Sequence, residues 1–204
     1  ASMPNIKVGK FITQVILQNI EVEDIDLSNA TDLRSAWVQN NPALQKLDLS
    51  YSTIWGQGDK ETEGNGTYGS SLMVLGCPIL KEIKLPEKNE LKAYRIDIEC
   101  LDALETFDMS NVKMVAELSI GDLNKDFNLV YPELTIFYSE DGYAGTYFAC
   151  SENTFYREST QAFLKANYTD IDPDDTVRRL GYTSSLSYDK NKGCRWRTLL
   201  NKQK

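Results

Sequence analysis

The segment Leu44-Gln-Lys-Leu-Asp-Leu49 follows the pattern apolar-x-x-apolar-x-apolar, and this pattern recurs along the chain at intervals of 22, 36 and 24 residues. Because side chains alternate along a strand, the last two apolar residues share one face and the polar residue between them lies on the other. A period in the twenties, made of one strand and a connecting arc, predicts a solenoid whose turns bury their apolar faces only by stacking. The other three copies are Val22-Glu-Asp-Ile-Asp-Leu27, Leu80-Lys-Glu-Ile-Lys-Leu85 and Leu104-Glu-Thr-Phe-Asp-Met109.

Prolines support the repeat outside the strands. A proline precedes a leucine by two residues in NPAL (41–44), CPIL (77–80) and YPEL (131–134), where it ends the preceding arc and holds the chain extended. By this criterion residues 134–138 are a further strand. Apolar residues in 91–98 and 115–120 are interpreted as second strands on the opposite arc. The equivalent stretch in the first unit, 33–38, is either such a strand or one helical turn.

The long step of 36 residues is explained by an insertion. Residues 55–71 are rich in glycine and charge and contain no aliphatic side chain, so they are predicted to project as a loop. Insertions of this kind either shape a binding face or are tolerated surface excursions.

The two ends are predicted to close a single domain that spans residues 1–204. Residues 1–20 are assigned to an N-terminal cap, in which FITQVILQNI (11–20) is a strand or short helix over the open end. The repeats occupy 21–138. The remainder, 139–204, is a C-terminal cap with aromatic residues that close the last unit. Its expected elements are a helix over 158–166 with Ser159 or Thr160 as N-cap, a short helix over 173–180, and a tail packed from 182 onward.

Composition excludes several classes of function. The chain has 204 residues, 30 acidic and 22 basic side chains and a formal net charge of −8, which disfavours duplex DNA or an anionic membrane as the main partner. Four C-terminal arginines are interpreted as a solvated surface rather than a polyanion site: Arg178, Arg179, Arg195 and Arg197. Histidine is absent, which removes the commonest general base and zinc ligand. No apolar run is long enough for a membrane span.

The four cysteines show neither a C-x-x-C pair nor metal-ligand spacing. We expect them to be buried free thiols that fill the solenoid. Cys77 and Cys100 precede equivalent strands by three and four residues, so a disulfide between them is the alternative if the protein is exported.

Candidate ligand contacts lie on the exposed, concave face of the predicted strands, with Trp55 of the inserted loop as a further candidate. The polar residue inside each repeat forms a ladder with rungs about 4.8 Å apart, and this ladder is either a solvated acidic stripe or a recognition surface. No metal site or cofactor is predicted, because the carboxylates of 170–175 lack the glycine and the distal glutamate of a calcium loop. The ladder residues are Asp26, Asp48, Lys84 and Asp108.

At IDLS (25–28), LDLS (47–50), IKLP (83–86) and FDMS (107–110), with the preceding NPAL and CPIL, the chain resembles leucine-rich repeat proteins of the irregular, BspA-like bacterial surface type. The resemblance covers about residues 20–138. It implies a mainly β or α/β solenoid, a right-handed coil with a parallel sheet of short strands between an N-terminal cap and an α-containing C-terminal cap. It also implies a secreted or cell-surface binding protein without catalytic residues.

The resulting hypothesis is a noncatalytic module for adhesion or protein recognition, acting as a monomer at the cell surface or outside the cell. Its partner is another protein or a host surface ligand, and the module is anchored, if at all, by an N-terminal signal. An intracellular, cytoplasmic adaptor is the alternative. A hydrolase using clustered carboxylates is the third hypothesis, which the lack of histidine disfavours.

Overall fold

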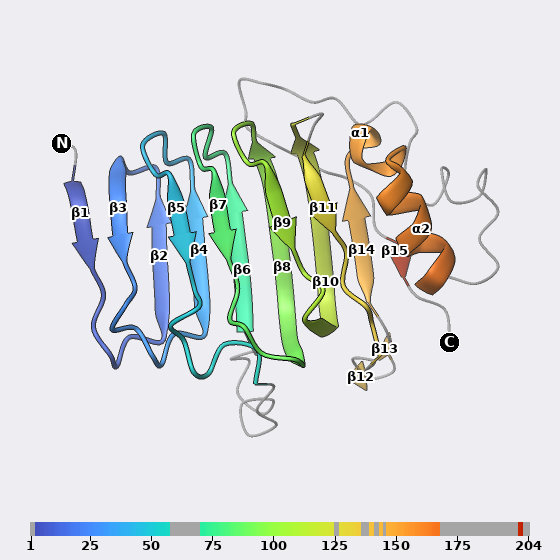
Figure 1. The fold of residues 1–204 in the computed structure, drawn as a ribbon, viewed down its shortest axis with the longest axis horizontal. Coiled ribbons are helices and arrows are strands. Elements are labelled where there is room, and N and C mark those ends of the chain that lie inside the picture. Colours follow the sequence, from blue (N-terminus) through green and yellow to red (C-terminus); the bar gives the residue numbers. More distant parts are fainter. Residues whose placement is uncertain are drawn as a thin grey trace.

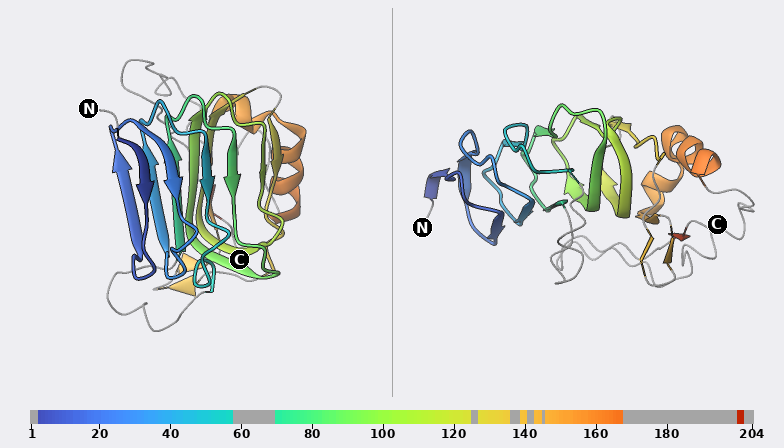
Figure 2. Two further views of the ribbon diagram at one scale, coloured as in Figure 1. Left: turned by 60° about the vertical axis from the view of Figure 1, so that its left-hand side comes forward. Right: turned by 90° about the horizontal axis from the view of Figure 1, so that it is seen from below.

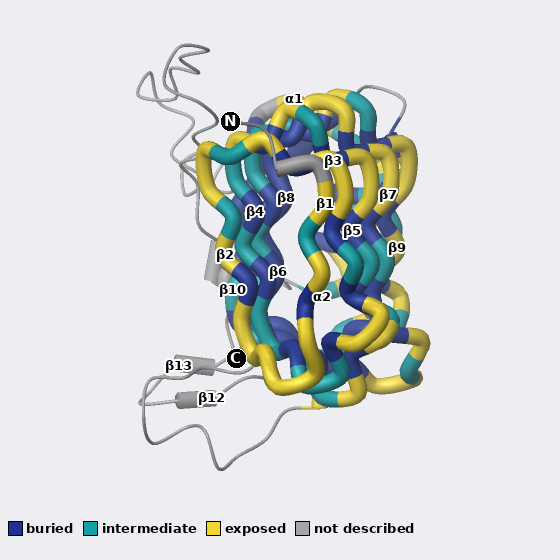
Figure 3. The backbone as a smooth tube through the Cα atoms, turned by 90° about the vertical axis from the view of Figure 1, so that its left-hand side faces the viewer, coloured by how far each residue is buried: buried dark blue, intermediate teal, exposed yellow. Residues whose placement is uncertain are grey.

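A computed structural model describes residues 3–57, 70–124, 127–135, 139–140, 143–144, 146–167 and 200–201. The chain forms a β-solenoid of about five turns, as predicted, and each full turn contributes a strand to each of two sheets (Figure 1). Seen from the N-terminal end, the two sheets lie opposite one another as the walls of the coil (Figure 3).

The repeat strands form the smaller wall. Strands β5 (Lys46–Asp48), β7 (Glu82–Lys84), β9 (Thr106–Asp108) and β11 (Asn128–Val130) pair in parallel, and β1 (Met3–Lys7) pairs with β3 (Val22–Asp26) beside them. All four predicted repeat strands are therefore confirmed. Of the further strand predicted at 134–138, residues 134–135 are in no strand and 136–138 lie outside the described residues. The fifth repeat strand of this wall is β11, before Pro132. Leu129 pairs with Phe107 and is buried, which continues the period of the preceding turn.

The arcs of the coil also end in strands, and these form a larger sheet. Its order is β15-β14-β10-β8-β6-β4-β2, parallel except at β15. The second strands expected at 91–98 and 115–120 are confirmed within β8 and β10. The helical turn offered for 33–38 is wrong, because this stretch contains β4, which alternates buried Ala36 and Val38 with partly exposed neighbours. The bounds are β2 Gln14–Gln18, β4 Ser35–Gln39, β6 Ser70–Leu75, β8 Leu91–Leu101, β10 Val112–Leu123, β14 Tyr147–Cys150 and β15 Leu200–Asn201.

The core lies between the two sheets. Each small strand contributes one central apolar side chain, such as Leu47 or Phe107, each 1% exposed. The large sheet contributes alternate residues such as Ile96 and Ile98, which are fully buried. One continuous apolar cluster therefore runs the length of the coil.

The two ends differ. The segment 11–20 contains β2, the terminal strand of the large sheet, and Phe11 in the preceding turn remains 82% exposed. At the other end, two helices pack beside the last strands (Figure 2): α1 (Glu152–Phe155) and α2 (Glu158–Asn167). The helix predicted over 158–166 is confirmed as α2. Because α2 begins at Glu158, Ser159 and Thr160 lie inside it and neither is its N-cap.

Phe163 of α2 connects this end to the core. Its ring stacks on Tyr131 at 4.5 Å between centroids and meets the edge of Phe148 at 5.4 Å. Two short strands, β12 (Ser139–Glu140) and β13 (Tyr143–Ala144), pair in antiparallel fashion before this region. The predicted helix over 173–180, the carboxylates of 170–175, the four C-terminal arginines and most of the inserted loop lie outside the described residues.

The cysteines only partly follow the prediction. Cys77 and Cys150 are buried free thiols, whereas Cys100 is disulfide-bonded. Because Cys77 is free, the alternative pair Cys77–Cys100 is excluded. Burial raises the pKa of Cys77 to about 11, so this thiol is a filler of the core rather than a nucleophile.

Candidate functional site

The predicted ladder residues lie on one outward face of the small sheet, which we call the charged face. Asp48 is in register with Lys84, and Asp108 is in register with Val130 of the next strand. Asp26 occupies the same position on β3. The structure thus brings together four of the five predicted contacts in the order expected from the repeat.

The aspartates of the charged face stabilise turns. Each accepts a hydrogen bond at Oδ1 from the backbone N–H two residues later: Ser28 to Asp26 at 2.9 Å, Ser50 to Asp48 at 2.9 Å and Ser110 to Asp108 at 2.8 Å. These are Asx turns, in which the carboxylate folds the chain back after the strand. Turn formation alone therefore explains why the Asp-x-Ser motif recurs, and a role in ligand recognition is not needed to explain it.

Lysines neutralise most of the remaining charge. Lys46 lies 3.7 Å from Asp48 and 3.2 Å from Glu82, and Lys84 lies 2.9 Å from Glu87. Hydrogen bonds from the Ser28 side chain and then from its backbone lower the pKa of Asp26. Exposed pairs of this kind contribute little stability. The charged face is thus a solvated mosaic of mixed sign.

Trp55, the fifth predicted contact, does not lie on a surface. Its side chain is fully buried, and its indole N–H donates to the backbone oxygen of Ser71 at 3.3 Å. The prediction of a ligand contact at Trp55 is corrected, because this indole anchors the start of the inserted segment in the core.

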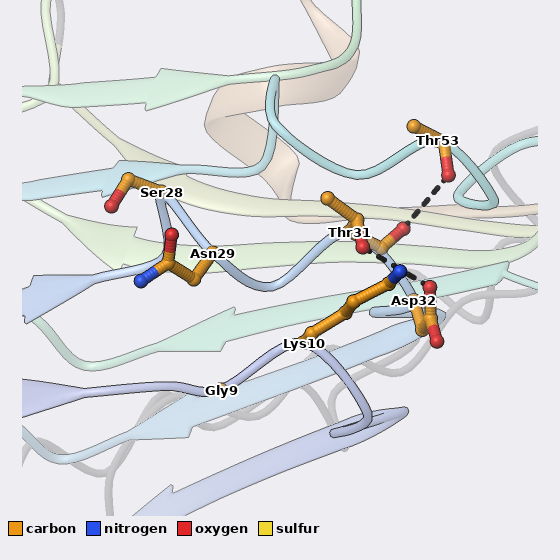
Figure 4. A pocket seen from close by; sticks show the side chains of 7 residues that line it. All are labelled: Gly9, Lys10, Ser28, Asn29, Thr31, Asp32 and Thr53. Atoms are coloured by element: carbon orange, nitrogen blue, oxygen red, sulfur yellow. Dashed lines mark hydrogen bonds between the residues drawn. The ribbon is translucent and has the colours of Figure 1, made fainter.

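A pocket opens beside the turns at the N-terminal end of the small sheet (Figure 4). Its volume is about 650 Å³, and most of the residues around it have polar side chains. The Thr53 hydroxyl donates to the backbone oxygen of Thr31 at 3.1 Å, and the Thr31 hydroxyl donates to Asp32 at 3.1 Å. These bonds hold the hydroxyls of the pocket wall against neighbouring acceptors. Its lining residues are Gly9, Lys10, Ser28, Asn29, Thr31, Asp32 and Thr53.

The outer side of the large sheet carries a row of apolar side chains that the sequence analysis did not single out. Ile16, Trp37 and Met73 are directly in register on β2, β4 and β6. Their strand neighbours point into the core, so these three point away from it. Ile16 is 48% exposed, and Trp37 and Met73 are half-buried. We call this set the apolar row; Figure 3 shows its three strands side by side in one wall of the coil.

Amide side chains border the apolar row. Gln18 and Gln39 lie in register two positions along, and the Gln18 side chain donates to Gln39 Oε1 at 3.5 Å. The Trp37 indole N–H donates to the same oxygen at 3.2 Å, which fixes the orientation of the ring. The surface is therefore an apolar strip with neutral hydrogen-bonding groups at its margin and no charged side chain on these strands.

Further along the same face lies a cluster of charged residues. Arg95 contacts Asp97 at 3.1 Å and Glu117 at 3.6 Å, and the Tyr94 hydroxyl donates to Glu117 at 3.4 Å. Asp97 is 2% exposed, and this burial raises its pKa, while a hydrogen bond with Glu99 and the charge of Arg95 act in the opposite direction. In the described part of the chain, Oδ1 of Asp97 has no hydrogen-bond partner.

Comparison with known proteins adds no assignment: no protein-family model, curated protein or solved structure matches this chain. Among the described residues, no group of three or more cysteines and carboxylates is arranged to hold a metal ion. Within the same residues, no helix is long and apolar enough to cross a bilayer.

The apolar row was missed because its signal is not contiguous. Ile16, Trp37 and Met73 are 21 and 36 residues apart and stand in the arcs, where the repeat pattern is weakest. Aligning QVILQ, SAWVQ and SLMVL by their position before the next repeat would have placed them on one line.

Proposed function

We propose that this chain is a noncatalytic binding module that recognises another protein through the apolar row. The observation that carries the proposal is the register of Ile16, Trp37 and Met73 on three adjacent strands, with their side chains directed away from the core. Tryptophan and methionine are enriched, and charged residues depleted, at the centres of protein interfaces.

The charged face is the weaker candidate for this role. Its aspartates are engaged in Asx turns and its lysines in ion pairs, so a partner would have to displace existing contacts there. The apolar row offers Trp37 as a rigid aromatic anchor already oriented by Gln39.

The disulfide at Cys100 favours the exported form of this module over the cytoplasmic adaptor. Disulfides persist in oxidising compartments and are rare in the cytosol. A leucine-rich repeat protein of the BspA-like surface type remains the class that the repeat motifs favour, and it agrees with a location at the cell surface.

The test compares proteins retained from a host-surface fraction by the immobilised native chain and by a Trp37→Gln, Met73→Gln variant. A matched control, Tyr51→Gln, alters an aromatic residue that is 48% exposed elsewhere. We expect the native chain and the control to retain the same partner protein. The double variant should bind this partner at least tenfold more weakly, a loss of about 1.4 kcal/mol in binding free energy. A partner indifferent to the double variant would refute the assignment to the apolar row.

A further inference from the structure

The outer side of the large sheet changes from open to covered along the line of the apolar row. Met73 on β6 is in register with Asp97 on β8, and the line continues through Ser119 on β10 to Ala149 on β14. Figure 1 shows these strands side by side. The strand neighbours of the last three residues lie in the core, so their own side chains point away from it. Met73 is half-buried, whereas Asp97, Ser119 and Ala149 are 2%, 2% and 0% exposed, so the outer side from β8 to β14 is covered.

The cover over Asp97 is expected to carry positive charge. Among the described elements, β8 has extensive contacts with its sheet neighbours β6 and β10 alone, so the cover comes from outside these elements. Glu99 and Glu117 lie near Asp97, and Arg95 is the cation that faces them. Oδ1 of Asp97 has no hydrogen-bond partner in the described part of the chain. Because burying carboxylates without compensating charge is costly, a basic segment is expected here.

A covalent link identifies this segment. Cys100, near the end of β8, is disulfide-bonded. The chain has four cysteines, and both Cys77 and Cys150 are free thiols. Within the chain, the one cysteine left as a partner is therefore Cys194.

The sequence after Cys194 has the charge that the cover requires. Residues 194–199 read Cys-Arg-Trp-Arg-Thr-Leu, with two arginines and no acidic residue. Arg195 follows Cys194 directly, as Glu99 directly precedes Cys100, so a bond between the two cysteines brings a guanidinium close to a buried carboxylate. The inserted loop is the weaker candidate for the cover, because residues 58–69 contain three acidic side chains and one basic side chain.

The position of β15 shows that residues 194–199 can span the distance. Leu200 on β15 pairs with Phe148, whose line in the sheet leads through β10 to Ile96, four residues before Cys100. Three strand spacings across the sheet and four residues along it separate Leu200 from Cys100, a diagonal of about 19 Å. Six extended residues reach about 20 Å, and a disulfide joins Cα atoms about 5.5 Å apart. The direct path across β10 and β14 is thus long enough, with little length to spare.

We propose that Cys100 and Cys194 form a disulfide and that residues 194–199 lie across the outer side of β10 and β14, with Arg195 beside Glu99. Forming the bond removes one proton and one electron from each thiol and passes them to an oxidant of the disulfide class, which is reduced to two thiols. Arg195, interpreted from the sequence as part of a solvated surface, is thereby assigned to the sheet.

The first test maps the disulfide in the full chain, refolded in a mixture of reduced and oxidised glutathione. Trypsin places the four cysteines in four different peptides: 61–81, 96–113, 126–157 and 193–195. Without reduction, mass spectrometry should find 96–113 linked to 193–195, and the other two peptides should carry free thiols that are alkylated after unfolding. Any other linked pair, a link between two copies, or four free thiols would overturn the proposal.

Single substitutions test the link from its two ends. Cys100→Asn keeps a residue suited to the left-handed backbone, and Cys194→Ser leaves β8 unchanged. Each should raise the free thiols of the unfolded chain from two to three, because each releases the other cysteine. The control Cys77→Ala should instead lower the count by one. A rise in one of the two variants without the same rise in the other would exclude a bond between these cysteines.

A third test locates the segment. With photoreactive p-benzoylphenylalanine in place of Trp196, ultraviolet light should attach this position to β10 or β14, whose tryptic peptides are 114–125 and 126–157. Fragmentation of the attached peptide identifies the strand. Attachment to a strand of the small sheet, or no attachment to β10 and β14, would overturn the assignment to the outer side.

This proposal does not rest on the proposed function, and the two fail separately. Asp97 lies next to Met73 in the same line, so the covered side limits the apolar row to β2, β4 and β6. Trp37→Gln, Met73→Gln should lose the partner and keep the linked peptides. Loss of the partner with the disulfide intact therefore tests the function, and a missing link with the partner retained tests the disulfide.

Discussion

At the scale of single residues, the aspartate of the Asp-x-Ser motif shows how a local bond can imitate a functional pattern. The carboxylates recur on one face because each closes the same turn, at Asp26, Asp48 and Asp108. Charge reversal at these positions would remove turns as well as surface charge, so it is a poor probe of binding.

Asp108→Ala should lower the free energy of unfolding by about 1 kcal/mol, the usual contribution of one intramolecular hydrogen bond. The bond in question joins the Ser110 N–H to Asp108 Oδ1 at 2.8 Å. Asp108→Asn keeps an oxygen acceptor and should cost less than half as much. Urea unfolding at neutral pH measures both, and equal losses in the two variants would contradict the turn assignment.

Asp97 should make stability depend on pH. Burial raises its pKa in the folded state above the ordinary value of 3.8, so the folded form resists ionisation more than the unfolded form does. Its contribution is most favourable below pH 3.8 and is lost as pH rises through the raised folded pKa. A tenfold difference in the acid dissociation constant between the folded and unfolded states corresponds to about 1.4 kcal/mol.

Asp97→Asn removes this titration, and Arg95 keeps Glu117 as a partner at 3.6 Å. Relative to the native chain, the variant should therefore gain stability as pH rises from about 4 to neutrality. Urea midpoints over that range provide the measurement. A difference between the two proteins that does not vary with pH would show that Asp97 titrates normally.

At the scale of elements, the strands of the large sheet end in a column of left-handed residues. Three of these residues directly follow a strand: Asn19 follows β2, Asn40 follows β4 and Gly76 follows β6, with φ of 54°, 52° and 63°. The fourth, Cys100, lies near the end of β8 and has φ of 52°. The Asn40 side chain donates to Asn19 Oδ1 at 2.8 Å, so the column is also bonded from turn to turn. Glycine and asparagine suit this conformation best.

Gly76→Ala should destabilise the fold by about 1 to 2 kcal/mol, the cost of a left-handed Cβ. An added Cβ would also lie 2.8 Å from Asn40 Oδ1. Gly76→Asn should cost less than Gly76→Ala, because asparagine occupies the same site in the two preceding turns. Gly9→Ala is the control, since nothing lies within 4 Å of its Cβ position. Thermal unfolding ranks the three, and a neutral Gly76→Ala would exclude strain in this column.

At the scale of the whole molecule, each turn of the coil contacts its neighbours, so stability is distributed nearly one-dimensionally. The C-terminal end depends on α2, where Phe163 packs against Tyr131 and Phe148. Damage at this end should spread from turn to turn rather than unfold every strand equally.

Phe163→Ala should cost about 3 to 5 kcal/mol at the C-terminal end, as for other buried aromatic residues. Amide hydrogen exchange should rise first in β14 and the adjacent part of β10, and β4 should stay protected. Peptide-resolved exchange by mass spectrometry provides the readout. A uniform rise across all strands would show that the molecule unfolds as one unit.

The sequence by itself determined the repeat strands, the solenoid, the second strands at 91–98 and 115–120, and helix α2, because each rests on a local apolar pattern. Only the tertiary structure decided the rest. Trp55 was placed in the core, since an aromatic residue at a loop boundary has no periodicity to reveal its direction. The fifth repeat strand was placed before Pro132, because stacking on Phe107 decides register.

The residues of the candidate site also fall into those that the sequence predicted and those that only the structure revealed. The ladder from Asp26 to Asp108 could be predicted, because its residues occupy one position of a visible repeat. The apolar row could not, because Ile16, Trp37 and Met73 meet only when arcs of unequal length are brought into register. Local pattern determines which residues alternate along a strand, and stacking alone determines which alternating residues become neighbours.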